Sequence, residues 1–279
     1  MIEVVRYDTT RTSEWDAFVS KSKNGTFILC RGFMDYHKDR FSDHSLMIYY
    51  NDKLLAVVPA HEQNQILYAH QGLTYGGVVW HKKVKFVQAF ECFKAVLFYA
   101  HRHDFVRLNL KEIPRIYAQL PCDELDYFLA LAQAKCIKKD VALVIDYDHV
   151  LGFEKNRREG LNKARRHELK VVCDDNFEAF WNTILIPELS QKHKAKPVHS
   201  LEEIKLLASR FPDNIKQVSV YNGDKLVAGT TVFLTRTVVH PQYVMGDPDK
   251  NKLGSIDLAY DFIIKEFASG RRYFDFNTS

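Results

Sequence analysis

The sequence predicts a mixed α/β (α+β) protein with two tandem domains of one fold, each a mixed, largely antiparallel sheet flanked by helices. The first observation is an order of elements that occurs twice: a helix, a β-hairpin, a strand, a second helix and a short strand. The second is the hydrophobic pattern, which alternates in the strand segments and has helical spacing between them. The third is the length of 279 residues, which suits two domains. We place the boundary near residue 145, giving domains of residues 1–145 and 146–279.

The two predicted hairpins are the clearest part of this repeat. Apolar and polar residues alternate on both sides of a turn at Asn51-Asp52, and again around Asn222-Gly223-Asp224. The residues Asp52-Lys53-Leu54 match Asp224-Lys225-Leu226. An aromatic-rich helix start precedes each hairpin, at residues 15–18 and 177–180. We therefore expect the two hairpins to occupy equivalent positions in the two domains.

The remaining elements follow in the same order in both halves. A strand with a His and a Tyr comes next, at residues 66–77 and 238–247. Amphipathic helices follow at 84–102 and 256–268, and short strands at 105–110 and 273–277. Between the copies, the pattern predicts a helix near 123–138 and a strand at 141–145.

Composition excludes several classes of protein. The net charge of +4 is too small to indicate nucleic-acid binding, so we expect no DNA partner. No stretch approaches the roughly 18 apolar residues that span a bilayer, and the N-terminus has no secretory pattern. The five cysteines are scattered and contain no CxxC, which argues against a disulfide framework or a metal site. These features are typical of a cytoplasmic protein without a membrane span.

Four segments together resemble one family. They are the glycine-containing segment Tyr68–Gly77, the basic segment Asn162–Arg166, the strand segment His240–Tyr243 and the following Phe274-Asp275-Phe276. In this order they resemble the Fem (FemAB-like) aminoacyl and acyl transferases, which carry two GNAT-like domains in tandem. The resemblance covers nearly the whole chain. It departs from the family in lacking a long charged helical hairpin in the second domain. The chain also stops directly after a strand where the family continues, so we expect the C-terminal domain to be incomplete as written.

The resemblance implies an N-acyltransferase that moves an acyl or aminoacyl group from an activated donor to an amine. The donor would be acyl-CoA or aminoacyl-tRNA, and the acceptor a small-molecule amine such as a cell-envelope precursor. It implies no permanently bound cofactor, with acyl-CoA as a co-substrate. The alternative is a catalytically idle binding module that kept the duplicated fold and lost its donor site.

Acyl transfer to an amine needs a base and a group that stabilises the oxyanion. The candidate catalytic residues are His70, His240 and Asp275. No Ser-His-Asp order and no paired-carboxylate spacing stands out, so we expect direct attack by the amine without a covalent enzyme intermediate.

Two segments are candidates for binding the acceptor. The first is the glycine loop with Gly72, Gly76 and Gly77, in which we expect Gly76 or Gly77 to have positive φ and His70 and Tyr75 to border a cleft. The alternative for this loop is a tight turn with a structural His. The second is the basic segment, where helical spacing brings Asn162, Arg165 and Arg166 within one turn. Arginines there suit a phosphate or carboxylate, and the alternative is a solvated helix face.

The candidate donor site lies between strand and helix near residues 245–257. Gly254 and Ser255 stand where a helix start is expected, and helix N-termini bind anions such as a pyrophosphate. The thioester would lie along the preceding strand, which assigns Gln242, Tyr243 and Asn277 to the same site. Asp247, Asp249 and Asp257 would repel phosphates, and the alternative is an ordinary capped loop.

Overall fold

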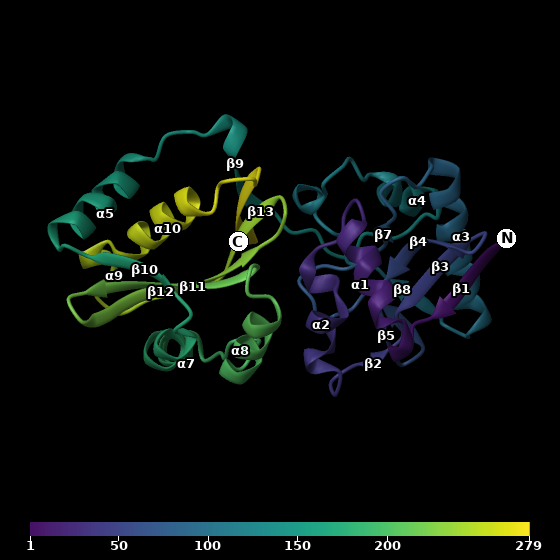
Figure 1. The fold of residues 1–279 in the computed structure, drawn as a ribbon, viewed down its shortest axis with the longest axis horizontal. Helices are drawn as coiled ribbons and strands as arrows, with labels where there is room; N and C mark the ends of the chain where they lie inside the picture. Colours follow the sequence, from purple (N-terminus) through teal and green to yellow (C-terminus); the bar gives the residue numbers. More distant parts are fainter. Residues whose placement is uncertain (279) are drawn as a thin grey trace. The chain divides into compact units, whose positions relative to one another are not determined.

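The computed structural model describes residues 1–278, and the chain divides into two compact units, Met1–Lys139 and Asp140–Ser279 (Figure 1). We call them unit 1 and unit 2. The expected boundary near residue 145 falls inside the first strand of unit 2, β9 (Ala142–Asp146). That strand pairs with the last strand of unit 2, which is why it belongs there.

Unit 1 carries two small sheets of four strands each, in the orders β1-β3-β4-β7 and β2-β5-β6-β8. Its strands are β1 (Ile2–Arg6), β2 (Ser42–Asp43), β3 (Leu46–Tyr50), β4 (Lys53–Val58), β5 (His61–Gln63), β6 (Ile66–Tyr68), β7 (Val79–Trp80) and β8 (Arg107–Asn109). Its α-helices are α1 (Thr12–Lys21), α2 (Arg31–Met34), α3 (Phe86–Arg102) and α4 (Glu124–Leu131). The sheets separate between β4 and β5, where Pro59 has no N–H to donate to a ladder.

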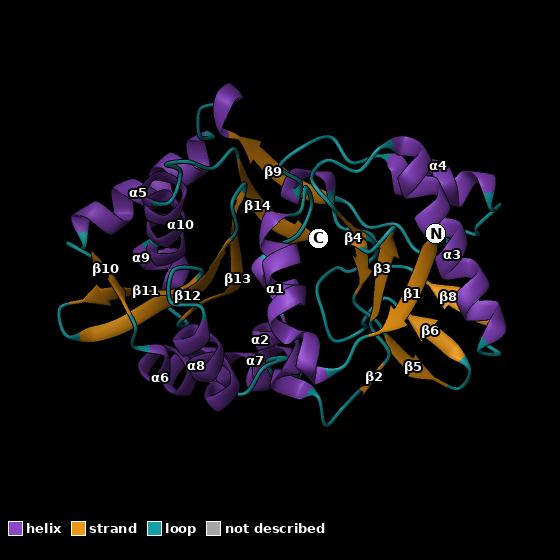
Figure 2. Ribbon diagram, turned by 45° about the vertical axis from the view of Figure 1, so that its right-hand side comes forward, coloured by secondary structure: helices purple, strands orange, loops and turns teal. Residues whose placement is uncertain are grey.

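Unit 2 has one sheet of six strands in the order β10-β11-β12-β13-β14-β9. The other strands are β10 (Lys170–Asp174), β11 (Ile215–Asn222), β12 (Lys225–Leu234), β13 (Val238–Gly246) and β14 (Tyr273–Thr278). The helices are α5 (Lys155–Arg166), α6 (Phe177–Phe180), α7 (Ile186–His193), α8 (Leu201–Arg210), α9 (Lys250–Leu253) and α10 (Ser255–Glu266). Helices cover both faces, with α5 and α10 on one side and α6, α7 and α8 on the other (Figures 1 and 2).

The two hairpins have the same register. In β3–β4, Tyr50 pairs with Lys53 and Tyr49 with Leu54, and the ladder then skips one residue. In β11–β12, Asn222 pairs with Lys225 and Tyr221 with Leu226, and again one residue is skipped. The skipped residues, Leu55 and Val227, are both buried. A bulge at the same place in both hairpins supports the internal repeat that the sequence indicates.

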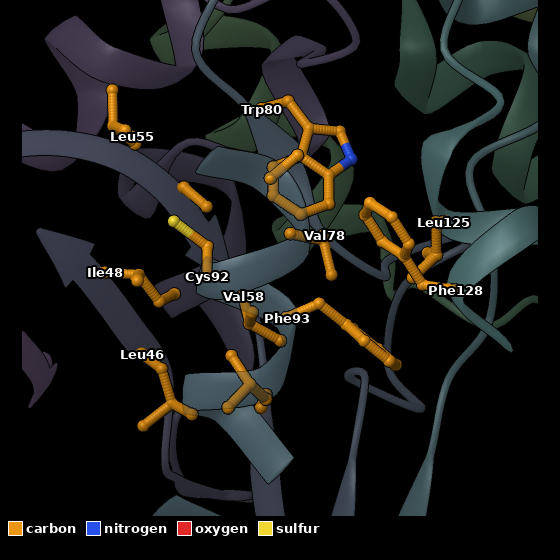
Figure 3. Close-up of a cluster of buried hydrophobic side chains, with 14 of the residues drawn as sticks. Leu46, Ile48, Leu55, Val58, Val78, Trp80, Cys92, Phe93, Leu125 and Phe128 are labelled. Carbon is orange, nitrogen blue, oxygen red and sulfur yellow. The ribbon is translucent and has the colours of Figure 1, made fainter. Parts of the chain in front are cut away.

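The core of unit 1 lies between the sheet and helices α3 and α4. Trp80 and Phe128 are fully buried there, with their ring centroids 6.3 Å apart (Figure 3). Phe93 of α3 stacks on Phe128 at 5.7 Å, which joins the two helices. The amphipathic pattern of residues 84–102 is therefore confirmed as a helix that packs on a sheet.

Two predicted elements are shorter than expected. The strand expected at 66–77 ends at Tyr68, because His70 turns the chain with a φ of +40° and a loop follows. The helix expected near 123–138 ends at Leu131, shortly before Gln133, which has a φ of +51°.

Candidate functional site

Strands β13 and β14 of unit 2 run parallel but separate almost at once. Among the described residues they pair only through Val238 with Tyr273 and Val239 with Phe274. On the other side of β13, the ladder with β12 has a bulge at Gln242, next to Pro241, which lacks an N–H. The bulge and the proline bend β13 away from β14, so a fork opens after Val239 and Phe274.

His240 and Asp275 are the first residues beyond that last pair. The His240 Nδ1 lies 3.5 Å from an Asp275 carboxylate oxygen, and both side chains are more than nine-tenths buried. Side chains alternate across a strand, and Val239 and Phe274 pack with α10. His240 and Asp275 therefore point to the opposite face, which α6, α7 and α8 cover.

The ring of His240 is buried beside the carboxylate of Asp275. Neither of its ring nitrogens has a hydrogen-bond partner within the described part of the chain, although both are buried. The neighbouring carboxylate of Asp275 accepts a hydrogen bond from the Asn277 backbone N–H at 2.9 Å. A histidine beside a carboxylate is a residue pair that can serve as a general base. Two predicted catalytic residues, 35 positions apart, thus lie together.

Tyr243 is held by its own hydroxyl group. The phenol oxygen lies 2.6 Å from His199 Nδ1 and accepts a hydrogen bond from the His199 backbone N–H at 3.2 Å. Burial raises the pKa of Tyr243 to about 12, so the phenol stays neutral. His199 is not among the predicted site residues, and no spacing or motif points to it. Gln242, the residue before Tyr243, has a buried side-chain oxygen without a hydrogen-bond partner among the described atoms.

The first turn of α10, the expected phosphate site, packs against α5. Gly254 has a φ of +72°, and a methyl group on it would lie 2.0 Å from the Gly160 carbonyl oxygen. Ser255 is completely buried. Asp257 in the same turn pairs with Arg157 of α5 at 2.7 Å. The glycines at 160 and 254 therefore let two helices meet where a pyrophosphate was expected. Asn277, assigned to the same site, lies near the end of β14 with a φ of +75°.

The outward face of α5 carries the predicted acceptor residues. Asn162, Arg165 and Arg166, together with Glu159, line an open hollow of about 490 Å³. Gly160, Leu161 and Ala164 occupy the buried side of the helix. The predicted grouping of the three polar residues within one turn is present, and all three are exposed.

The glycine loop of unit 1 differs from what we expected. His70 and Tyr75 are buried among side chains of unit 1, where each contacts other aromatic rings. The Tyr75 hydroxyl donates to Thr26 Oγ1 at 2.9 Å, and its ring packs on Tyr117. Gly77 has a φ of +77°, as predicted for one of the two glycines. His70 and Tyr75 thus belong to the interior of unit 1. The glycines allow close packing, because a methyl group on Gly76 would lie 2.7 Å from the Ala69 carbonyl oxygen.

His70 is part of an aromatic cluster. Its ring centroid lies 5.1 Å from those of His37 and Phe41 and 5.4 Å from that of His61. A methyl group on Gly72 would meet the His37 ring at 2.2 Å. Burial, and then repulsion by His37 and His61, lower the pKa of His70 to about 3. The imidazole is therefore neutral and enclosed, and we do not carry the loop residues into the proposed site.

Among the side chains that the structure describes, no group of three or more His, Cys, Asp or Glu could hold a metal ion. No helix in residues 1–278 has the length and apolar character needed to cross a membrane.

Comparison with solved structures gives a fold of known type. FemX superposes with a TM-score of 0.65 at 10% identity, over 99% of this chain and 89% of FemX. The C-terminal domain of an Agrobacterium fabrum protein, described as a lysylphosphatidylglycerol synthetase, gives 0.62 at 10% identity, over 98% of this chain and 80% of the other. L-PGS from Bacillus licheniformis gives 0.61 at 9% identity, over 97% and 76%. No protein-family model and no curated protein matches the sequence.

At this level of identity the likeness is one of fold. The predicted fold class, two mixed and largely antiparallel GNAT-like domains in tandem, is confirmed, and the chain shares this fold with FemX. The roles of individual residues rest on the geometry above.

Proposed function

We propose that unit 2 transfers an acyl or aminoacyl group from an activated donor to an amine, and that the reaction takes place at the fork between β13 and β14. The observation that carries this proposal is the buried pair of His240 and Asp275, 3.5 Å apart at the start of the fork. The buried ring nitrogens of His240 have no hydrogen-bond partner among the described residues, so they are available to a substrate.

In this mechanism the amine of the acceptor attacks the carbonyl carbon of the donor directly. His240 accepts the proton that the nitrogen loses, and Asp275 stabilises the resulting imidazolium. The tetrahedral oxyanion needs hydrogen-bond donors, and the edge of β13 that faces the fork can offer backbone N–H groups. When the intermediate collapses, the leaving thiolate or ribose oxygen takes the proton back from His240, so the enzyme returns to its starting state.

The packing of α5 on α10 favours aminoacyl-tRNA over acyl-CoA as the donor. Coenzyme A phosphates at the first turn of α10 would compete with Gly160 for the space beside Gly254. The exposed Arg165 and Arg166 instead offer cations on the outer face of α5, beside the open hollow. The phosphates of a polynucleotide donor would bind to exposed cations of this kind. The acceptor would be a small amine, such as a cell-envelope precursor, in the cytoplasm.

The test is a transfer assay with the purified protein. Labelled acetyl-CoA and tRNA charged with labelled amino acids are each offered with a panel of primary amines. We expect transfer from charged tRNA, and a loss of at least about 100-fold for His240→Gln, the usual contribution of a general base. The variant should unfold at the same denaturant concentration as the wild type. Equal rates for His240→Gln and the wild type would remove His240 from the mechanism.

A second candidate function is the idle binding module. It is favoured by the closed first turn of α10 and by the acidic Asp247 and Asp249 beside it. This candidate predicts no transfer from either donor, together with saturable binding of an anionic ligand that weakens when Arg165 and Arg166 are both changed to Glu.

A further inference from the structure

Strand β1 of unit 1 has an open backbone edge. It pairs with β3 on one side, and no other described strand adjoins it. Tyr7 N–H donates to the Ser45 carbonyl, and Asn51 N–H donates to that of Met1, which fixes the phase of the ladder. In an antiparallel pair such bonds involve every second residue, so Ile2, Val4 and Arg6 direct their N–H and C=O groups to the open side.

An open groove of about 720 Å³ runs along this edge, between β1 and helix α3. On the helix side it is lined first by Ala95 and Phe98 and, one turn on, by Arg102 and His103. Phe98 is 64% exposed, although it is a large apolar residue. The rise from Phe98 to Arg102 is about 6 Å. Alternate side chains of a strand are spaced by about 6.7 Å, so a strand laid along β1 would match the two turns.

The charge in the groove is positive. Arg102 is exposed and has no ion-pair partner among the described residues. His103 stacks on Tyr99 with centroids 3.9 Å apart and uses its Nδ1 on the Tyr99 carbonyl oxygen. Ile2 and Val4 pack towards α3, so strand alternation turns the Glu3 side chain to the opposite face. Glu3 is also among the lining residues, and Arg6 is paired with Glu62, so a carboxylate on a ligand would meet its cation at Arg102.

We propose that this groove binds an extended peptide, which adds a strand to β1 and carries an apolar residue two positions from an acidic one. The backbone of the peptide bonds to the open groups of Val4 and its neighbours. Its apolar side chain lies on Phe98, and its carboxylate lies at Arg102. The proposal concerns unit 1 alone and is independent of the transfer reaction.

The probe is a library of random heptapeptides displayed on phage, selected on the immobilised full-length protein. We expect the enriched peptides to carry Asp or Glu two positions from an apolar or aromatic residue. Val4→Pro removes one outward N–H and leaves the bonds to β3 in place, so it should weaken the selected peptides by about tenfold. Val4→Ile keeps that N–H and should bind like the wild type.

The second part of the test inverts the charge at Arg102. Arg102→Glu should shift the selected residue from acidic to basic, whereas Lys82→Glu, an exposed inversion outside the groove, should leave the selection unchanged. The proposal is overturned if no peptides are enriched, if they show no acidic preference, or if Val4→Pro binds them as the wild type does. A dimer of the chain that Val4→Pro dissociates and that excludes the peptides would also overturn it, in favour of a second copy on this edge.

Discussion

In both units two parallel strands separate and leave a fork, but the chain that follows the fork differs between the units. In unit 1, β6 and β8 pair in parallel through Ile66 with Arg107, Leu67 with Leu108 and Tyr68 with Asn109. The chain then leaves this sheet at Ala69 and enters the other sheet of unit 1 as β7, where Trp80 pairs with Ala56 of β4. In unit 2, β13 passes straight through the corresponding place with a single bulged residue. The glycine loop thus stands where unit 2 has one extra residue.

The loop closes the fork of unit 1 with backbone. Ala69 N–H donates to the Asn109 carbonyl at 2.7 Å, and Gly76 N–H donates to that of Lys111 at 2.8 Å. The Lys111 ammonium group returns a bond to the Leu73 carbonyl at 3.2 Å. Two strands that part therefore make a site only where no loop fills the gap. Under the proposed function, the fork of unit 1 contributes to stability and that of unit 2 to the reaction.

The strongest test of this difference exchanges each buried histidine for glutamine. His240→Gln should lower the transfer rate by at least about 100-fold and leave the unfolding transition in place. His70→Gln should leave the rate unchanged and destabilise unit 1, because it puts an amide into an aromatic cluster. Both variants are measured in the transfer assay and by urea unfolding. The same loss of rate in both would show that the two forks do not differ as we argue.

Helix packing in unit 2 gives the next largest effect. Gly254→Ala should lower the free energy of unfolding by about 3 kcal/mol, since it adds a clash with α5 to the cost of a positive φ. Gly223→Ala is the matched control, with a φ of +58° and nothing within 4 Å of the added methyl group. It should cost only about 1 kcal/mol, the cost of the positive φ alone.

Denaturant unfolding of both glycine variants measures the difference. Equal costs would mean that α5 moves aside easily. In that case the first turn of α10 could open to an anion, and the case against coenzyme A would lose its main support.

The buried His70 makes unit 1 sensitive to acid. Its pKa in the folded chain is about 3, whereas an unfolded histidine titrates near 6.5. Between these values the unfolded chain binds more protons, so stability falls as the pH falls through 6.5 and continues to fall to about 3. From this group alone we expect a loss of about 2 kcal/mol between pH 7 and pH 5.

The pKa of His61 and that of His44, both in unit 1, are also lowered mainly by burial, so they act in the same direction. His70→Phe keeps a ring and removes the proton, and it should reduce the acid sensitivity. Amide hydrogen exchange at pH 7 and pH 5 locates the effect. Protection that falls equally in the strands of unit 2 would contradict its assignment to the histidine cluster.

The sequence predicted the elements that depend on local pattern. The turn at Asn51-Asp52 and the helical face of Phe93 follow from periods of two and of 3.6 residues. His240 and Asp275 were predicted as separate candidates. Their proximity was not predicted, because it depends on how two distant strands pair. The burial of His70 was not predicted, since glycines beside a histidine occur both at ligand loops and at close packing. Three-dimensional neighbours such as Ala69 and His37 decide between those two cases, and no local spacing encodes them.

The smallest expected effect comes from changing one buried tyrosine in each unit. Tyr75→Phe removes the hydrogen bond to Thr26 in unit 1, and Tyr243→Phe removes the contacts with His199 in unit 2. Each should cost about 1 kcal/mol, the net contribution of a buried hydrogen bond.

Tyr243 lies three residues beyond His240 on the same strand, so its loss should also loosen the fork and lower the transfer rate by a few fold. Tyr75 anchors a loop that only closes a gap, so Tyr75→Phe should leave the rate unchanged. A change in rate for Tyr75→Phe at constant fold would bring the glycine loop back into the reaction.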